Sequence, residues 1–139
     1  MDGYYFEDLS LGQSASFAKT ITEADILLFA AISGDTNPVH INAEAAAASM
    51  FKERIAHGML SASLISTVLG TKLPGAGTVY LGQNLKFKAP VRIGQTVTAT
   101  VVITALDAGK KRVTLSTTCT VEGKAVIEGE AIVMVQARA

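Results

Sequence analysis

Cysteine, tryptophan and proline are scarce in this chain of 139 residues, which holds one Cys, no Trp and three Pro. The single cysteine, Cys119, excludes a disulfide framework within the chain and makes a cysteine-based metal site improbable. Because Cys119 lies in a run of Thr and Val, we expect it to be a buried core thiol.

Net charge is also lacking, since twelve Lys and Arg balance twelve Asp and Glu. Without a basic surface the chain is not expected to bind nucleic acid. No apolar run approaches the ~20 residues of a membrane span, and residues 1–8 lack the pattern of a signal peptide. We therefore expect a cytoplasmic protein with no membrane partner. The length predicts a single domain over residues 1–139, and the apolar composition predicts a surface covered by a second copy.

The first half of the chain has the hydrophobic pattern of helices. Thr22 and Asp25 form a capping pattern ahead of an apolar stretch that ends at Gly34. The Asn-Pro pair at 37–38 predicts a break, because a residue before proline avoids the helical region. We expect Asn42 to cap a second helix that reaches about Phe51. A third helix, from about Gly58, is apolar or small on every face and should be buried centrally.

The second half alternates apolar and polar residues with a period of two, which is typical of antiparallel strands solvated on one face. Strands are expected at 79–88, 96–104, 112–119 and 125–135, with hairpin turns at 107–110 and 122–124. The fold class that follows is α+β, with an antiparallel sheet that wraps one long apolar helix.

Two histidines, His40 and His57, are the only ones in the chain. Asp35 and His40 lie five residues apart in the 34–40 segment, which follows a helix end and contains a proline, so we expect a loop there. A carboxylate and an imidazole held on one water can activate it and return a proton. The alternative is that Asp35 is a turn residue and His40 an ordinary half-buried histidine. No third ligand stands at a recognisable spacing, so we predict no metal site.

Gly58 stands at the predicted start of the apolar helix. The first backbone N–H groups of a helix lack internal partners and carry the positive end of its dipole. A glycine there lets a ligand oxygen approach closely, as is needed to polarise a carbonyl. The alternative is a packing glycine.

Three segments of the chain together resemble the MaoC-like hydratases: residues 33–40 (SGDTNPVH), 55–60 (IAHGML) and 80–91 (YLGQNLKFKAPV). Within that family the chain is most similar to (R)-specific enoyl-CoA hydratases, in the same order over nearly its whole length. The resemblance implies a hot-dog fold, in which an antiparallel sheet wraps a long helix. It also implies a homodimer whose sheets join edge to edge, with active sites between the subunits.

Carried over to this chain, the resemblance makes Asp35 and His40 the acid–base pair. It makes the backbone N–H of Gly58 the hydrogen-bond donor to the thioester carbonyl. Ser66 would hydrogen-bond within the site and help to orient the pair. Asn37 would shape the loop, and His57 matches the motif without an evident chemical role. The implied substrates are a trans-2-enoyl-CoA and water, the product is an (R)-3-hydroxyacyl-CoA, and no metal or redox cofactor is required.

Basic residues near the last motif are candidates for the phosphates of CoA, namely Lys86, Lys88 and Arg92. The alternative for these residues is a solvated strand edge. Three competing functions stay open at this stage: a hot-dog thioesterase, a dehydratase acting on carrier-protein thioesters, and a noncatalytic binding module.

Overall fold

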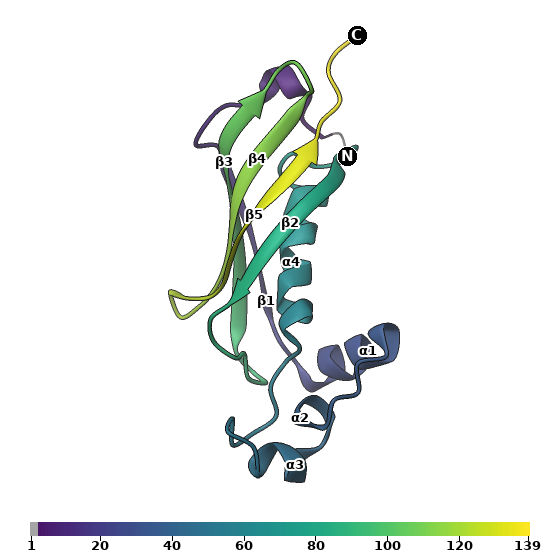
Figure 1. The fold of residues 1–139 in the computed structure, drawn as a ribbon, viewed down its shortest axis with the longest axis vertical. Helices are drawn as coiled ribbons and strands as arrows, with labels where there is room; N and C mark the ends of the chain where they lie inside the picture. The colour runs from purple at the N-terminus through teal and green to yellow at the C-terminus, as the bar shows by residue number, and fades with distance from the viewer. Residues whose placement is uncertain (1–2) are drawn as a thin grey trace.

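The structure, a computed structural model, describes residues 3–139, so the first two residues of the predicted domain and N-terminal segment lie outside it. A curved antiparallel sheet wraps the long helix α4, Gly58–Thr71, as expected for the α+β fold class. Three short helices gather at one end of the sheet, and both chain ends lie toward the other end (Figure 1).

The sheet has the strand order β1-β3-β4-β5-β2, so that β1 and β2 are its two edges. All neighbouring strands are antiparallel. The strands are β1 Ser14–Thr20, β2 Val79–Phe87, β3 Thr96–Asp107, β4 Arg112–Val121 and β5 Lys124–Met134. The two predicted hairpins therefore join β3 to β4 and β4 to β5.

The period-two pattern places one face of the sheet on α4. On β3 and β4 the alternate positions that face α4 are buried, Thr117 among them, while the Thr and Ser positions on the other face are at most partly covered. The core lies between these strands and the helix side chains Leu64, Ile65, Val68 and Leu69. Cys119 is buried in it, as predicted, and burial raises the pKa of its thiol to about 11.

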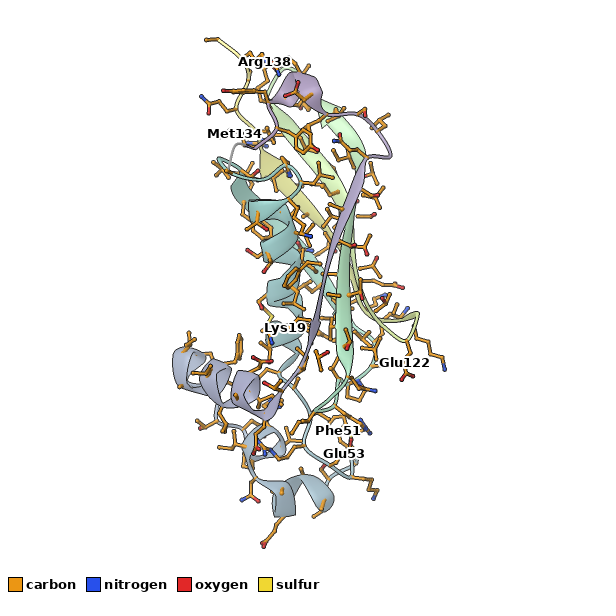
Figure 2. The ribbon with its side chains drawn as sticks, turned by 180° about the vertical axis from the view of Figure 1, so that it is seen from behind. Lys19, Phe51, Glu53, Glu122, Met134 and Arg138 are labelled. Carbon is orange, nitrogen blue, oxygen red and sulfur yellow. The ribbon has the colours of Figure 1, made fainter. Side chains whose placement is uncertain are left out.

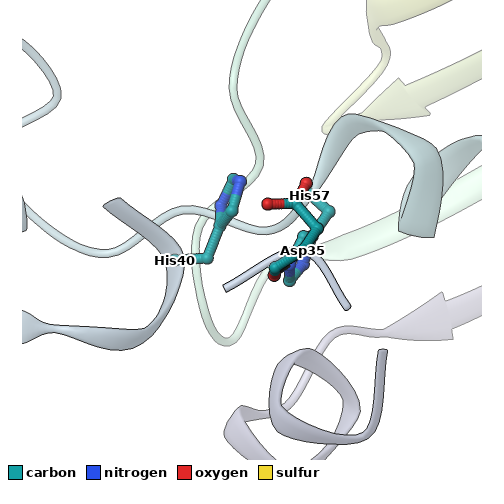
Figure 3. A group of neighbouring side chains, drawn as sticks. All are labelled: Asp35, His40 and His57. Atoms are coloured by element: carbon teal, nitrogen blue, oxygen red, sulfur yellow. Dashed lines mark hydrogen bonds between the residues drawn. The ribbon is translucent and has the colours of Figure 1, made fainter. Parts of the chain in front are cut away.

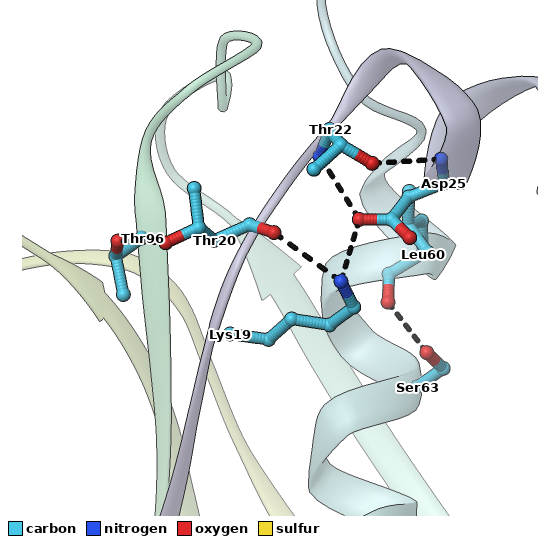
Figure 4. A network of polar contacts seen from close by, with 7 residues as sticks. All are labelled: Lys19, Thr20, Thr22, Asp25, Leu60, Ser63 and Thr96. Atoms are coloured by element: carbon cyan, nitrogen blue, oxygen red, sulfur yellow. Dashed lines mark hydrogen bonds and ion pairs between the residues drawn. The ribbon is translucent and has the colours of Figure 1, made fainter.

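Helix α1, Glu23–Ser33, begins and ends where the sequence predicts. The Thr22 hydroxyl accepts a hydrogen bond from the Asp25 N–H, and the Asp25 carboxylate accepts one from the Thr22 N–H. Lys19 on β1 also bonds this carboxylate at 2.8 Å, which ties the helix start to the sheet edge (Figure 4). Gly34 ends the helix with a φ of 78°, in the left-handed region that glycine adopts freely.

Two expectations about the first half are corrected. The 34–40 segment is not all loop, because Pro38 starts the one-turn helix α2, Pro38–Ile41, with Asn37 as its cap. The second predicted helix, α3, spans only Ala43–Ala47. Although Asn42 caps it as expected, the Ser49 hydroxyl bonds the Ala46 carbonyl and the Phe51 N–H, and so competes with further helical bonds.

Helix α4 is not covered on every side in the single chain. Its sheet-facing side is buried, but Met59, Ser63 and Ser66 are exposed on the side away from the sheet.

Figure 2 shows the molecule from behind, with the short helices near Phe51 and Glu53 and the end with Arg138 opposite. No helix within residues 3–139 is long and apolar enough to cross a membrane.

Candidate active site

A cavity of about 590 Å³ opens between the N-terminal end of α4 and the segments on either side of it. Its lining brings together residues that are far apart in the sequence, including Asp35, His40, His57, Gly58 and Lys88. Most of the remaining wall is apolar, with Phe51, Ile55, Phe87, Val91 and Ile127 among its members.

The loop before α2 presents Asp35 to this cavity. The Asp35 carboxylate accepts a hydrogen bond from the Asn37 N–H at 3.2 Å, and the Asn37 side chain accepts one from the Val39 N–H at 3.2 Å. Asp35 can therefore be both a turn residue and a site residue, because the turn fixes the position of its exposed carboxylate. Asn37 caps α2 through its bond from the Val39 N–H and does not line the cavity.

His40 is held in one orientation from α2. Its Nδ1 lies 2.8 Å from the Ile55 carbonyl oxygen. A carbonyl only accepts, so this contact assigns the proton to Nδ1 and leaves the lone pair on Nε2. The Arg54 Nε donates to the His40 carbonyl at 2.7 Å, and Arg54 also pairs with Glu23 at 2.6 Å. The ring of His40 can therefore accept a proton on one nitrogen only.

His57, which matched the motif without an evident role, lies beside the predicted pair as a third member of the group. One ligand-type atom from each of Asp35, His40 and His57 lies within 4.8 Å of the other two (Figure 3). The two imidazole rings stack at a centroid distance of 3.9 Å with 28° between their planes. The lone pair of an imidazole nitrogen points outward in the plane of its ring. Two ring planes so nearly parallel intersect much farther from the nitrogens than the ~2.0–2.1 Å of a metal–nitrogen bond. The stacked geometry does not suit a metal held by both rings.

Gly58 is the first residue of α4, so its N–H has no acceptor within the helix. A Cβ at this position would lie 2.7 Å from Cε1 of Phe87. The glycine thus lets the Phe87 ring close over the helix start and keeps the N–H at the cavity wall. Both functions assigned to this glycine from the sequence, packing and close approach, are compatible with the geometry.

The structure does not bring Ser66 to this cavity. Ser66 is exposed on the far side of α4, whereas Ser61, five residues earlier, is buried and lines the wall. Five residues along an α-helix amount to a rotation of about 140° and a rise of about 7.5 Å, so the two serines cannot share a face. Within one chain Ser66 does not line the cavity, and Ser61 is the serine that shares its wall with Asp35 and His40. The orienting role of Ser66 stays a prediction.

Of the three basic residues proposed for CoA binding, only one lines the cavity. Lys88 lines the cavity and pairs with Glu128 at 3.4 Å, both side chains being nearly half exposed. Arg92 instead bonds Glu53 and the Phe51 carbonyl and so holds the 51–53 segment in place. Lys86 is exposed on β2 and does not line the cavity.

Residues 9–125 match the MaoC-like domain family. The chain belongs to this family. It is 67% identical over 135 residues to an (R)-specific enoyl-CoA hydratase of Rhodospirillum rubrum, which covers 97% of this chain and 94% of that one. It is 47% identical over 131 residues to a 3-hydroxybutyryl-CoA dehydratase of Methylorubrum extorquens, covering 94% of this chain and 83% of the relative.

Among solved structures, the R-hydratase PhaJ1 of Pseudomonas aeruginosa superposes with a TM-score of 0.93 at 44% identity, over 98% of this chain and 88% of that one. The hot-dog fold expected from the sequence is confirmed. This MaoC-like chain therefore carries a carboxylate, an imidazole and a free helix N–H around one cavity of a known enzyme fold.

Proposed function

We propose that this MaoC-like chain catalyses the reversible, (R)-specific hydration of trans-2-enoyl-CoA thioesters. The observation that carries the proposal is the shared cavity, on which Asp35, His40 and the Gly58 N–H converge. The similarity to an (R)-specific enoyl-CoA hydratase over nearly the full length supports the substrate class.

In this proposal Gly58 polarises the thioester carbonyl. Its N–H is unpaired within α4 and stands at the positive end of a 14-residue helix. A hydrogen bond to the carbonyl oxygen withdraws electrons from the double bond and stabilises the enolate that forms when the β-carbon is attacked.

Asp35 and His40 activate the water. The Nε2 of His40 is the nitrogen with a lone pair, and the Asp35 carboxylate lies within 4.8 Å of the imidazoles. The pair takes one proton from the water as its oxygen bonds to the β-carbon, and one proton reaches the α-carbon from the same side. The hydroxyl and the added hydrogen balance the water consumed. No metal or redox cofactor takes part in these steps.

Lys88 is the basic residue proposed to meet the phosphates of CoA, because it alone of the three candidates lines the cavity. Its ion pair with Glu128 is solvent-exposed and therefore worth little, so that it can be exchanged for a phosphate.

A homodimer is part of the same proposal. Strand β2 is an unpaired sheet edge and carries four large apolar side chains that are 41–52% exposed, namely Val79, Tyr80, Leu81 and Phe87. Pairing of two such edges would cover these side chains and the open side of α4, where Ser66 lies. Any contact of Ser66 with substrate would then be made at the subunit interface. Sedimentation at assay concentration should show a dimer, and an active monomer would contradict it.

The decisive experiment follows the loss of absorbance of crotonyl-CoA and longer enoyl-CoAs, with chiral analysis of the product. We expect (R)-3-hydroxyacyl-CoA, undiminished after treatment with a chelator. Release of free thiol without hydration would favour a thioesterase, and activity confined to carrier-protein thioesters would favour a dehydratase of that class. The cytoplasmic location stays part of the proposal and is tested by fractionation of the source cells.

A further inference from the structure

His57 lies at the junction between the Asp35 loop and helix α4, and it is only 2% exposed. Two other aromatic rings pack against its ring. His40 stacks on one face at 3.9 Å between centroids, and Phe29 of α1 packs against the ring at 4.9 Å with a tilt of 52°. The ring thus has a fixed place between α1 and the catalytic imidazole.

The edge of the same ring contacts the backbone of Asp35. Nε2 of His57 lies 2.8 Å from the Asp35 carbonyl oxygen, so Nε2 carries the hydrogen and donates it. Nδ1 is buried and has no hydrogen-bond partner among residues 3–139. Because no solvent reaches Nδ1, a substrate atom does not reach it either. His57 is therefore not a reacting group.

The contact to Asp35 differs from every other hydrogen bond of its loop. Within the described chain, the bonds of residues 34–37 otherwise join positions at most four apart, such as Asp35 N–H to Ser33 and Asn37 N–H to Asp35. The bond from His57 spans 22 positions. Among residues 3–139 it is the one hydrogen bond that joins this loop to a distant segment of the chain.

We propose that His57 is a positioning residue that sets the placement of both members of the acid–base pair relative to Gly58. Its Nε2–H holds the backbone of Asp35, and its ring face supports the imidazole of His40. As the residue directly before Gly58, it links the pair to the carbonyl-binding N–H. The inference rests on the proposed hydratase function, because its main readout is turnover of that reaction.

A matched set of variants separates the two contacts. His57→Phe keeps an aromatic ring beneath His40 and removes the donor to Asp35. His57→Gln places an amide N–H near the position of Nε2 and removes the ring. Phe29→Leu loosens the packing of α1 against the His57 ring and removes neither the donor to Asp35 nor the ring beneath His40, so it serves as the packing control.

We expect His57→Phe to lower kcat about 10–100-fold, the scale of a small misplacement of reacting groups, with a much smaller change in KM. His57→Gln should recover part of that loss, although it stabilises the fold less than Phe does. Phe29→Leu should lower the melting temperature and leave kcat within about twofold. A purely structural His57 predicts instead that kcat per folded molecule stays normal in all three, and that result overturns the proposal.

A second measurement does not depend on catalysis or on a variant that folds. In the wild-type protein, ¹⁵N chemical shifts of the imidazoles should show hydrogen on Nε2 of His57 and on Nδ1 of His40. A hydrogen on Nδ1 of His57 with an unprotonated Nε2 would remove the donor and overturn the proposal. If the wild-type protein hydrates no enoyl-CoA and the shifts are as expected, the proposed function fails and the placement of the loop by His57 stands.

Discussion

In the sheet, neighbouring strands are joined by long ladders of backbone hydrogen bonds, with a register shift in three of the four strand pairs. The segments around the cavity are joined by a few backbone bonds, such as that from the Ile55 N–H to the Val39 carbonyl, and by side chains that bond backbone carbonyls. His40, Arg54 and His57 each make such a bond across 14 to 22 positions. The sheet buries apolar side chains on one face and contains no reacting group. The cavity end contains the reacting groups, which lie on the loop before α2, on α2 and at the first residue of α4.

The difference means that stability and activity depend on different parts of the molecule. A strand register is maintained by many equivalent bonds, so one lost side chain changes packing and leaves the backbone where it was. At the cavity end fewer contacts hold each segment, and several of them are single side-chain bonds, so one substitution is expected to move a reacting group. The following predictions test this division, in order of their expected effect on turnover.

The largest effect is expected at the pair itself. Asp35→Asn and His40→Gln should each lower kcat by about 10²–10⁴-fold, because each removes one half of the acid–base couple. The double variant should lose little beyond the worse single one, since both groups act on one water. Steady-state kinetics measures kcat, and circular dichroism shows that each variant is folded. Full activity in either folded single variant would contradict the assignment of the pair.

Gly58→Pro removes the N–H that is proposed to bind the carbonyl. Proline suits the first position of a helix, and the ψ of 136° at His57 is compatible with a following proline. We expect a loss of about 10²–10³-fold in kcat. Gly58→Ala retains the N–H but crowds Phe87, so both variants are measured in a Phe87→Ala background as well. Equal activity of the proline and alanine variants in that background would contradict the role.

Arg54→Lys should lower kcat about tenfold, the equivalent of one lost hydrogen bond of ~1.4 kcal/mol. The lysine keeps the charge beside Glu23 but lacks the Nε that donates to the His40 carbonyl. Glu23→Gln is the control, since it weakens only the ion pair to an exposed carboxylate and should leave turnover normal. The two variants differ in outcome only if the contact to His40 matters.

Much of the sheet end could be predicted from the sequence, because it repeats local rules. The Thr22–Asp25 capping box, the alternation along β3 and β4 and the hairpin at 122–124 each depend on neighbours within a few positions. The cavity end follows only in part. The Asp35–His40 spacing indicated a site, and the His-Gly pair before an apolar helix was a signal for His57. Nothing local indicated that Arg54 would reach His40, or that Ser61 and not Ser66 would line the wall.

In the sheet, Leu115→Ala should lower the free energy of unfolding by about 2–5 kcal/mol, because the side chain is fully buried and leaves a cavity. The kcat of the molecules that remain folded should be unchanged, since the backbone register on both sides of β4 persists. Denaturant unfolding and active-site titration measure the two quantities separately. A fall in kcat comparable to that of Arg54→Lys would contradict the claim that the sheet determines stability and the cavity end determines turnover.

Ionisation of Cys119 should affect neither turnover nor stability at neutral pH, and its effect on stability is expected only in alkali. Burial raises the pKa of its thiol from the usual 9.0 to about 11. Between these values the unfolded chain ionises the thiol and the folded chain does not, so unfolding releases a proton. The stability that this group provides is thus complete below about pH 9 and falls at about 1.4 kcal/mol per pH unit as the pH rises toward 11. Lysines and tyrosines titrate in the same range, so the informative quantity is the difference in this slope between the wild-type chain and Cys119→Ala. Parallel slopes would mean that the thiol is accessible to water, and the core between β4 and α4 would then be less tightly closed than its burial indicates.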